Sequence, residues 1–412
     1  MAPSQTIPDA LLSAPETSPS GASYCWEQAI SSIGQTSRPM EFASAQLATT
    51  EATPLGITLY APPDLSETIE KGAWDSRHLV DGLRREMQIR AADVRQRRIP
   101  WLSWELPHAL LDSADITELM YFVGRLFQLD ANEDRFFSVN FRPEELSANR
   151  VALFKGLGFN SLEIHFPSDI EPSPGQLAEL METSDDFHFQ HFGLNLKQPI
   201  DSLPRCIAQY VGDGGRKPDR VTLRNLDRDK GPHQGENFSG RFPDFFQALR
   251  DQGYRVLGND CFVLPNSPLA VAQNNHHLKL NAQGYNSQNV SDMVGIGPGS
   301  ISCHRHGRSH NPVDLPEYLA FDFAGQAHGT AFHHQGKLVI DQLLCYHQLD
   351  LKYFEDRYHL QLEPLLRELW SPLQDHSCPP LFSIHQHQLT LSPEGILRLS
   401  HLCRELIVHF CD

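Results

Sequence analysis

The sequence predicts an α/β fold arranged as a parallel barrel or sheet. Strand-like and helix-like segments alternate from about residue 55 onward, with short connections, for about six repeats. This order is typical of parallel strands joined by crossover helices. The chain has 412 residues, of which 40% are apolar and 21% charged. It is therefore long enough for a barrel-sized core with a smaller appended unit.

The predicted strands are short apolar segments: residues 57–60, 101–104, 136–140, 161–166, 193–196, 220–223 and 254–259. Helical patterns stand between them at residues 76–97, 114–128 and 147–158, the last ending on Gly158, which suits a helix C-cap. In parallel barrels the functional groups lie at the C-terminal ends of the strands. The loop after Tyr60 is therefore expected at a functional site.

Beyond about residue 325 the pattern becomes helical. Helical periodicity covers residues 336–370 and 392–410, and residues 381–395 between them have the alternation of a short hairpin or wing. We therefore predict a small helical, winged C-terminal domain. Winged modules often bind DNA, but this segment has few Lys or Arg residues.

The composition narrows the classes of partner. The net charge of -17 argues against nucleic-acid binding, which needs clustered Lys and Arg. We expect no membrane segment, because no apolar run has membrane-spanning length, and the first residues lack the pattern of a secretory signal. The eight cysteines form no CxxC pair, which favours free thiols in the cytoplasm. A small molecule or another protein is the expected partner.

Three segments carry a resemblance to a known family: residues 258–273 (GNDCFVLPNSPLAVAQ), 281–288 (NAQGYNSQ) and 292–302 (DMVGIGPGSIS). Together they resemble the oxygen-independent coproporphyrinogen III oxidases, which are radical S-adenosylmethionine enzymes of haem synthesis. The resemblance extends to TSRPMEF at residues 36–42 and to the C-terminal segments. It implies a partial (β/α)6 barrel with a helical C-terminal domain. Residues 1–32 are rich in Ser, Pro, Ala and Thr, which predicts a mobile extension. The predicted parts of the chain are therefore this extension at 1–32, a segment over the barrel at 33–54, the barrel at 55–325 and the helical C-terminal domain at 326–412.

The resemblance also implies a cofactor site that this chain lacks. Family members hold a [4Fe-4S] cluster on three cysteines spaced C-x3-C-x2-C directly after the first strand, and the cluster binds S-adenosylmethionine. Here that loop reads APPDLSETIEKGAW, without a cysteine. Four further cofactor-side positions differ from the family pattern: Glu105 with Leu106, Asn140, Pro167 and Leu194. We therefore expect neither a cluster nor S-adenosylmethionine.

The substrate side of the resemblance is kept, and it implies a porphyrin-sized pocket lined by Asp260, Gln273, Gly284, Tyr285 and Gln288. The alternative is a structural turn in which the Tyr285 hydroxyl anchors a loop.

Many of the 21 histidines lie beyond residue 270. Cys303, His304, His306 and His310 are candidate ligands of haem iron or a divalent metal, with Arg305 and Arg308 beside them for propionates. The alternative is a polar loop whose histidines face water. His333, His334, His385 and His387 are weaker candidates.

Three functional hypotheses remain open from the sequence. The first is a catalytically degenerate relative that binds haem, a porphyrin or a protein partner in tetrapyrrole metabolism. The second is a coproporphyrinogen III oxidase-type enzyme with an unorthodox cluster or metal site. The third is a structural subunit that binds no small molecule.

Overall fold

The computed structural model describes residues 40–42, 53–63, 65, 75–94, 97–166, 173–223, 236–281, 283–304, 307–323, 327–331, 334–373 and 379–411. Residues 1–32, most of 33–54 and most of the loop after Tyr60 thus lie outside the described residues. No helix in the described part of the chain is long and apolar enough to cross a membrane.

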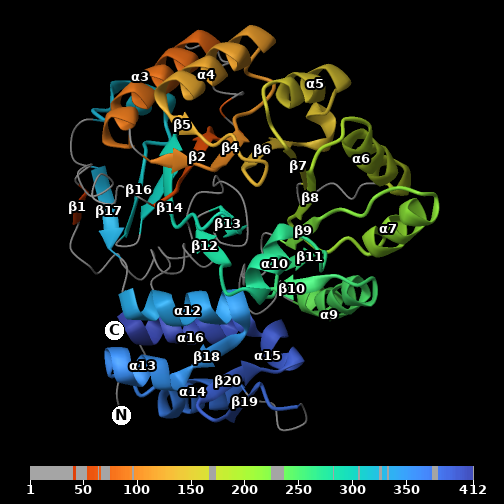
Figure 1. Ribbon diagram of the computed structural model, residues 1–412, viewed down its shortest axis with the longest axis vertical. Helices are drawn as coiled ribbons and strands as arrows, with labels where there is room; N and C mark the ends of the chain where they lie inside the picture. The colour runs from red at the N-terminus through yellow and green to blue at the C-terminus, as the bar shows by residue number, and fades with distance from the viewer. Residues whose placement is uncertain are drawn as a thin grey trace.

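A curved sheet forms the frame of the molecule (Figure 1). Its central strands run parallel, which confirms the α/β prediction. They are, in spatial order, β14 (Asp292–Ile296), β2 (Leu55–Tyr60), β4 (Trp101–Glu105), β6 (Phe136–Phe141), β7 (Ser161–Phe166), β8 (His191–Leu196) and β9 (Arg220–Leu223).

Both edges of the parallel sheet are extended by antiparallel strands. After β9 come β11 (Cys261–Val263) and β10 (Arg255–Leu257). The segment predicted from the sequence as one further strand at 254–259 is thus the first arm of an antiparallel hairpin. At the other edge lie β15 (Ile301–His304), β16 (Gly307–His310), β17 (Ala327–Ala331) and β1 (Met40–Phe42).

Helices cover the outer, convex side of the sheet (Figure 1). Their starts are marked by side-chain caps: Asp112 accepts hydrogen bonds from the Ala114 and Asp115 amides, and Ser147 caps the next helix. Their apolar faces pack on the outward residues of the strands in the main core. These helices are α3 (Ser76–Val94), α4 (Ser113–Leu126), α5 (Ala148–Gly156), α6 (Pro174–Asp186), α7 (Leu203–Gly212) and α9 (Glu236–Asp251).

The C-terminal part has its own apolar core, which also includes residues of β10 and β11. The predicted wing is present as β19 (Phe382–His385) and β20 (Gln388–Leu391), joined by β18 (Gln348–Asp350) into a three-stranded sheet. The helices are α12 (His334–Tyr346), α13 (Leu351–Tyr358), α14 (Leu362–Trp370), α15 (Pro393–Leu397) and α16 (Leu399–Cys411).

A short hairpin lies between the two ends of the parallel sheet (Figure 1). It consists of β12 (Lys279–Asn281) and β13 (Gly284–Asn286), which pair only with each other. The Tyr285 hydroxyl donates a hydrogen bond to the Leu344 carbonyl of α12 at 3.3 Å. The hairpin is therefore tied to the C-terminal part of the chain.

Candidate functional site

Alternate residues of the barrel strands point to opposite faces of the sheet. On β4, Leu102 and Trp104 lie in the outer core, whereas Trp101, Ser103 and Glu105 line a cavity inside the barrel. β6 repeats the pattern with Phe136, Ser138 and Asn140 on the inner face. The barrel interior is thus lined by an aromatic layer at the N-terminal ends of the strands and by polar side chains above it.

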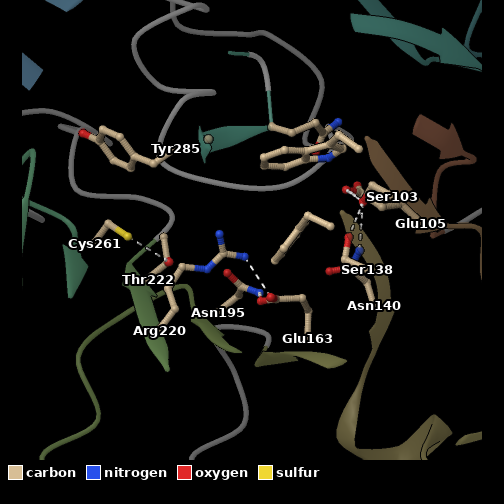
Figure 2. A pocket seen from close by; sticks show the side chains of 14 residues that line it. Ser103, Glu105, Ser138, Asn140, Glu163, Asn195, Arg220, Thr222, Cys261 and Tyr285 are labelled. Carbon is tan, nitrogen blue, oxygen red and sulfur yellow. Dashed lines mark hydrogen bonds and ion pairs between the residues drawn. The ribbon is translucent and has the colours of Figure 1, made fainter. Parts of the chain in front are cut away.

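One wall of the interior is a hydrogen-bonded group on β4 and β6 (Figure 2). The Ser103 hydroxyl donates to Glu105 Oε1 at 3.0 Å, and Ser138 donates to Ser103 at 3.2 Å. The Asn140 amide reaches Ser103 at 3.3 Å and the Trp104 carbonyl at 3.2 Å. These contacts hold the Glu105 carboxylate and the Asn140 amide in fixed positions.

The opposite wall is centred on a buried ion pair. Arg220 on β9 lies 2.9 Å from Glu163 Oε1 on β7. Asn195 on β8 donates to Glu163 Oε2 at 2.9 Å, and Ser161 donates to Oε1 at 3.1 Å. A Cβ atom on Gly193 would collide with the Glu163 carboxylate, so glycine at that position makes room for the pair. Both ionised groups are compensated inside the barrel.

Cys261 on β11 is the thiol that faces this interior (Figure 2). Its sulfur accepts a hydrogen bond from the Thr222 hydroxyl at 3.7 Å. Burial raises the pKa of the thiol to about 12, so the sulfur is protonated at neutral pH. A protonated thiol is a poor nucleophile, because the thiolate is the reactive form.

Two cavities of similar size share this interior. The upper cavity, about 450 Å³ including space open to solvent at its mouth, reaches the C-terminal ends of the strands at Glu105 and Asn140. The lower cavity, about 430 Å³ on the same measure, lies at the N-terminal ends of β4, β6, β8 and β9. Both are lined by Trp101, Phe136, Glu163, Arg220 and Tyr285.

The floor beneath β2 and β14 is closed by apolar side chains. Met293, Val290 and Trp101 form a small buried cluster. The Met293 side chain occupies the space beside Gly56, where a Cβ would collide with it. The lower cavity therefore lies at the N-terminal ends of β4, β6, β8 and β9 and does not extend beneath β2 and β14.

The structure separates the five residues expected to line a porphyrin-sized pocket. Gly284 and Tyr285 line the upper cavity, and Tyr285 and Gln288 line the lower one. Gln273 instead bonds to the Cys345 carbonyl at 2.8 Å and to Arg255 at 2.9 Å, a role in joining the barrel to α12. Asp260 is buried beside β9, where its carbonyl accepts the Leu223 amide at 2.7 Å.

The candidate metal ligands are only partly described. Cys303 is buried and faces Arg308 across the ladder, while His310 faces Ile301, two positions away. The His304 side chain and all of His306 lie outside the described residues. Within the described residues, no group of three or more His, Cys, Asp or Glu side chains is placed to hold a metal ion.

The resemblance assigned several positions to the cofactor side. The structure shows which of them face the barrel interior and which face the outer helices. Glu105 and Asn140 face the interior, as expected. Leu194 packs in the outer core, and its neighbour Asn195 is the residue that faces inward. The difference from the family pattern at Leu194 therefore removes no contact inside the barrel, because the side chain at that position points toward the outer helices. Pro167 lies outside the described residues.

Several interior residues were not singled out from the sequence. Glu163, Asn195 and Arg220 belong to short apolar strands and carry no motif of their own. The alternation of polar and apolar residues could have indicated them, because alternate residues of a strand point to the same face. Ser161 and Glu163 alternate with apolar residues on β7, as Arg220 and Thr222 do on β9.

No family model matches the chain. Among curated proteins it is similar to oxygen-independent coproporphyrinogen III oxidases. It is 23% identical to that of Pseudomonas aeruginosa over 326 residues, covering 71% of this chain and 70% of the relative. It is 27% identical to that of Thermostichus vulcanus over 306 residues, covering 66% of this chain and 92% of the relative. With the protein of Synechocystis sp. the identity is 33% over 257 residues, 55% of each chain.

A solved structure agrees with these sequence similarities. Coproporphyrinogen III oxidase from Escherichia coli, described as a radical SAM enzyme, is 20% identical, and the match covers 89% of this chain and 93% of that chain with a TM-score of 0.69. The shared architecture includes the curved parallel sheet and the helical C-terminal part. In sequence the chain is therefore similar to the oxygen-independent coproporphyrinogen III oxidases, and it has the fold of the Escherichia coli radical SAM enzyme, as its sequence motifs predicted.

Proposed function

We propose that the protein binds a tetrapyrrole related to coproporphyrinogen and performs no radical S-adenosylmethionine chemistry. One observation carries the proposal: a chain with this fold has no cysteine between Cys25 and Cys206. The segment that follows the first barrel strand therefore offers no thiolate.

The residues of this chain do not fit a [4Fe-4S] cluster after β2. A cluster needs several thiolates that converge on one cube. The described cysteines, Cys206, Cys261, Cys303, Cys345 and Cys403, are buried on five different elements. Serine and aspartate, which the loop does contain, are hard ligands and poor replacements for thiolate sulfur.

The end of β4 supports the same conclusion for S-adenosylmethionine. In the family resemblance this stretch is glycine-rich, so that bare backbone approaches the cofactor. Here Leu106 is buried in the main core and Glu105 projects into the barrel, bonded to Ser103. Side chains occupy the space that a glycine-rich stretch would leave open.

The substrate-side hairpin supports binding of a tetrapyrrole. The relatives are named for coproporphyrinogen, and the segment that carries the strongest resemblance contributes lining residues to both cavities. Gln288, at the edge of that cover, is half-buried, and its amide donates to the Asp134 carbonyl at 3.0 Å. A flat macrocycle lying against this edge would leave its charged side chains in solvent.

Titration of the purified protein with coproporphyrin III and with haem tests the proposal. We expect saturable one-to-one binding, seen as a shifted Soret band and quenched tryptophan fluorescence. Gln288→Ala should weaken binding about fivefold through the loss of one polar contact. The matched variant Gln273→Ala removes contacts to Cys345 and Arg255 and should lower stability without changing affinity. The proposal fails if neither tetrapyrrole binds the wild type.

The alternative, an enzyme with an unorthodox metal site, depends on His304 and His306. The described residues give it no specific support, since Cys303 and His310 are offset along the β15–β16 ladder. Metal analysis of the purified protein and of a His304→Ala/His306→Ala variant separates the two: bound metal that disappears in the variant would favour the enzyme.

A further inference from the structure

The lower cavity lies away from the end of the barrel where the loop after Tyr60 begins. Its walls come from the first residues of the strands, namely Trp101, Phe136, His191 with Phe192, and Arg220. Pro268, Leu269, Ser287 and Gln288 cover its open side. The cavity is therefore distinct from the C-terminal edge of the barrel, where Glu105 and Asn140 lie.

A group of aromatic rings in contact with one another forms part of its wall. The ring centroids of Trp101 and Phe136 are 4.9 Å apart, and those of Phe136 and His191 are 5.6 Å apart. The Arg220 guanidinium lies over the Phe136 ring at 5.7 Å. Such a stack of tilted rings presents flat apolar faces to whatever enters.

The charged groups in the wall are already compensated. Arg220 is paired with Glu163, as described above. The Asp219 carboxylate accepts the Phe192 amide at 2.8 Å and lies 4.0 Å from Arg216. A ligand with a net charge would have to be desolvated here without gaining a counter-charge, which is costly.

His191 supplies the polar function of the cavity. Its ring is largely buried, and burial lowers its pKa to about 4, so it is neutral at pH 7. A neutral imidazole has one N–H donor and one acceptor nitrogen. No hydrogen bond of this ring is found within the described residues, and His191 lines the cavity, so the ring can offer a hydrogen bond to a ligand there.

We propose that the lower cavity binds a small, uncharged, flat aromatic molecule of one or two rings that carries a hydroxyl or ring N–H group for His191. The volume of about 430 Å³ includes space that is open to solvent, so the enclosed part is smaller than an ordinary ligand site and does not admit a four-ring macrocycle with its side chains. This site shares Gln288 with the edge proposed for the tetrapyrrole, but its other walls lie inside the barrel.

A series of one-ring probes tests the site by calorimetry on the intact protein. Phenol matches the proposed ligand, toluene lacks the polar group, and benzoate and benzamidinium add a negative or a positive charge. We expect phenol to bind most tightly, toluene about fivefold more weakly, and both ions at least tenfold more weakly than phenol.

His191→Phe keeps an aromatic wall but removes both nitrogens. It should abolish the preference for phenol over toluene while leaving toluene affinity within about twofold. The control His188→Asn changes an exposed histidine in the turn before β8 and should change neither affinity. Binding of no probe up to 10 mM (about 3 kcal/mol), tightest binding of an ion, or an unchanged phenol preference in His191→Phe would overturn the proposal. Because no tetrapyrrole is used, failure here leaves the proposed function standing.

Discussion

His347 shows how one buried side chain connects the two parts of the chain. It follows α12, and its Nε2 lies 2.6 Å from the Gly258 carbonyl at the β10–β11 turn. Burial lowers its pKa from 6.5 to about 4. The folded state therefore favours the neutral ring, so this contribution to stability is complete above pH 6.5 and is lost as the pH falls from 6.5 through about 4.

We predict that His347→Gln will reduce the loss of unfolding free energy as the pH falls below 6.5. Glutamine keeps a donor amide for Gly258 but does not titrate. A shift of this size corresponds to a contribution on the order of 3 kcal/mol. Urea unfolding at pH 7.5, 6.5 and 4.5 should show the wild type losing more stability than the variant below pH 6.5. Parallel losses in both proteins would show that His347 does not titrate as described.

A second residue-level prediction concerns Gly297, in the turn after β14. Its φ of +115° belongs to the region that favours glycine, and an added Cβ would collide with the Tyr60 carbonyl. Gly297→Ala should therefore cost at least about 2 kcal/mol of unfolding free energy. Gly124→Ala is the control, since Gly124 lies inside α4 with open space around it. That change should be neutral or stabilise the protein by up to about 1 kcal/mol. Equal effects of the two changes would contradict the steric explanation.

At the scale of elements, the Glu163–Arg220 pair joins β7 to β9 across β8. Glu163 is 3% exposed, so removing its cation leaves a buried charge. Arg220→Met should destabilise the protein by about 3–5 kcal/mol. The double variant Glu163→Gln/Arg220→Met should recover a large part of that loss. A double-mutant cycle by chemical denaturation measures this coupling, and additive effects would mean that the pair contributes little.

The strands also show which features of the fold can be predicted from sequence patterns and which cannot. Periodicity located the barrel strands and the wing, because each is decided by local alternation. It did not show that residues 254–259 begin a hairpin, since the pairing of β10 with β11 depends on tertiary contacts. Nor did it show that β1 pairs with β17, nearly 300 positions away in sequence: Met40 faces Gly329.

The sequence predicted only part of the site, because local patterns do not show which residues meet in the folded chain. Gly284, Tyr285 and Gln288 were found because they belong to a motif. Leu194 was assigned to the cofactor side, but a one-residue difference in strand alignment reverses the face, and Asn195 is the inward residue. Glu163 and Arg220 meet only when β7, β8 and β9 are assembled, so no local pattern identifies them as a pair.

At the scale of the whole molecule, barrel and C-terminal part share apolar packing. The second core combines Leu257 and Cys261 with residues of α12, α14 and α16. Polar contacts cross the same boundary, including Asn259 to Ser400 at 2.9 Å and Tyr346 to the Leu278 carbonyl at 2.9 Å. We therefore expect one cooperative thermal transition, with near-ultraviolet and far-ultraviolet circular dichroism coinciding. Two separate transitions would show that the parts unfold independently.

The proposal that concerns the whole molecule is that the barrel shares the architecture of a radical SAM enzyme but performs no radical chemistry. Anaerobic reconstitution with iron, sulfide and reductant, followed by iron analysis and electron paramagnetic resonance, tests it most directly. We expect no stoichiometric [4Fe-4S] protein, because no cysteine follows β2 before Cys206. One cluster per chain, with a reduced-cluster signal that changes when S-adenosylmethionine is added, would contradict it.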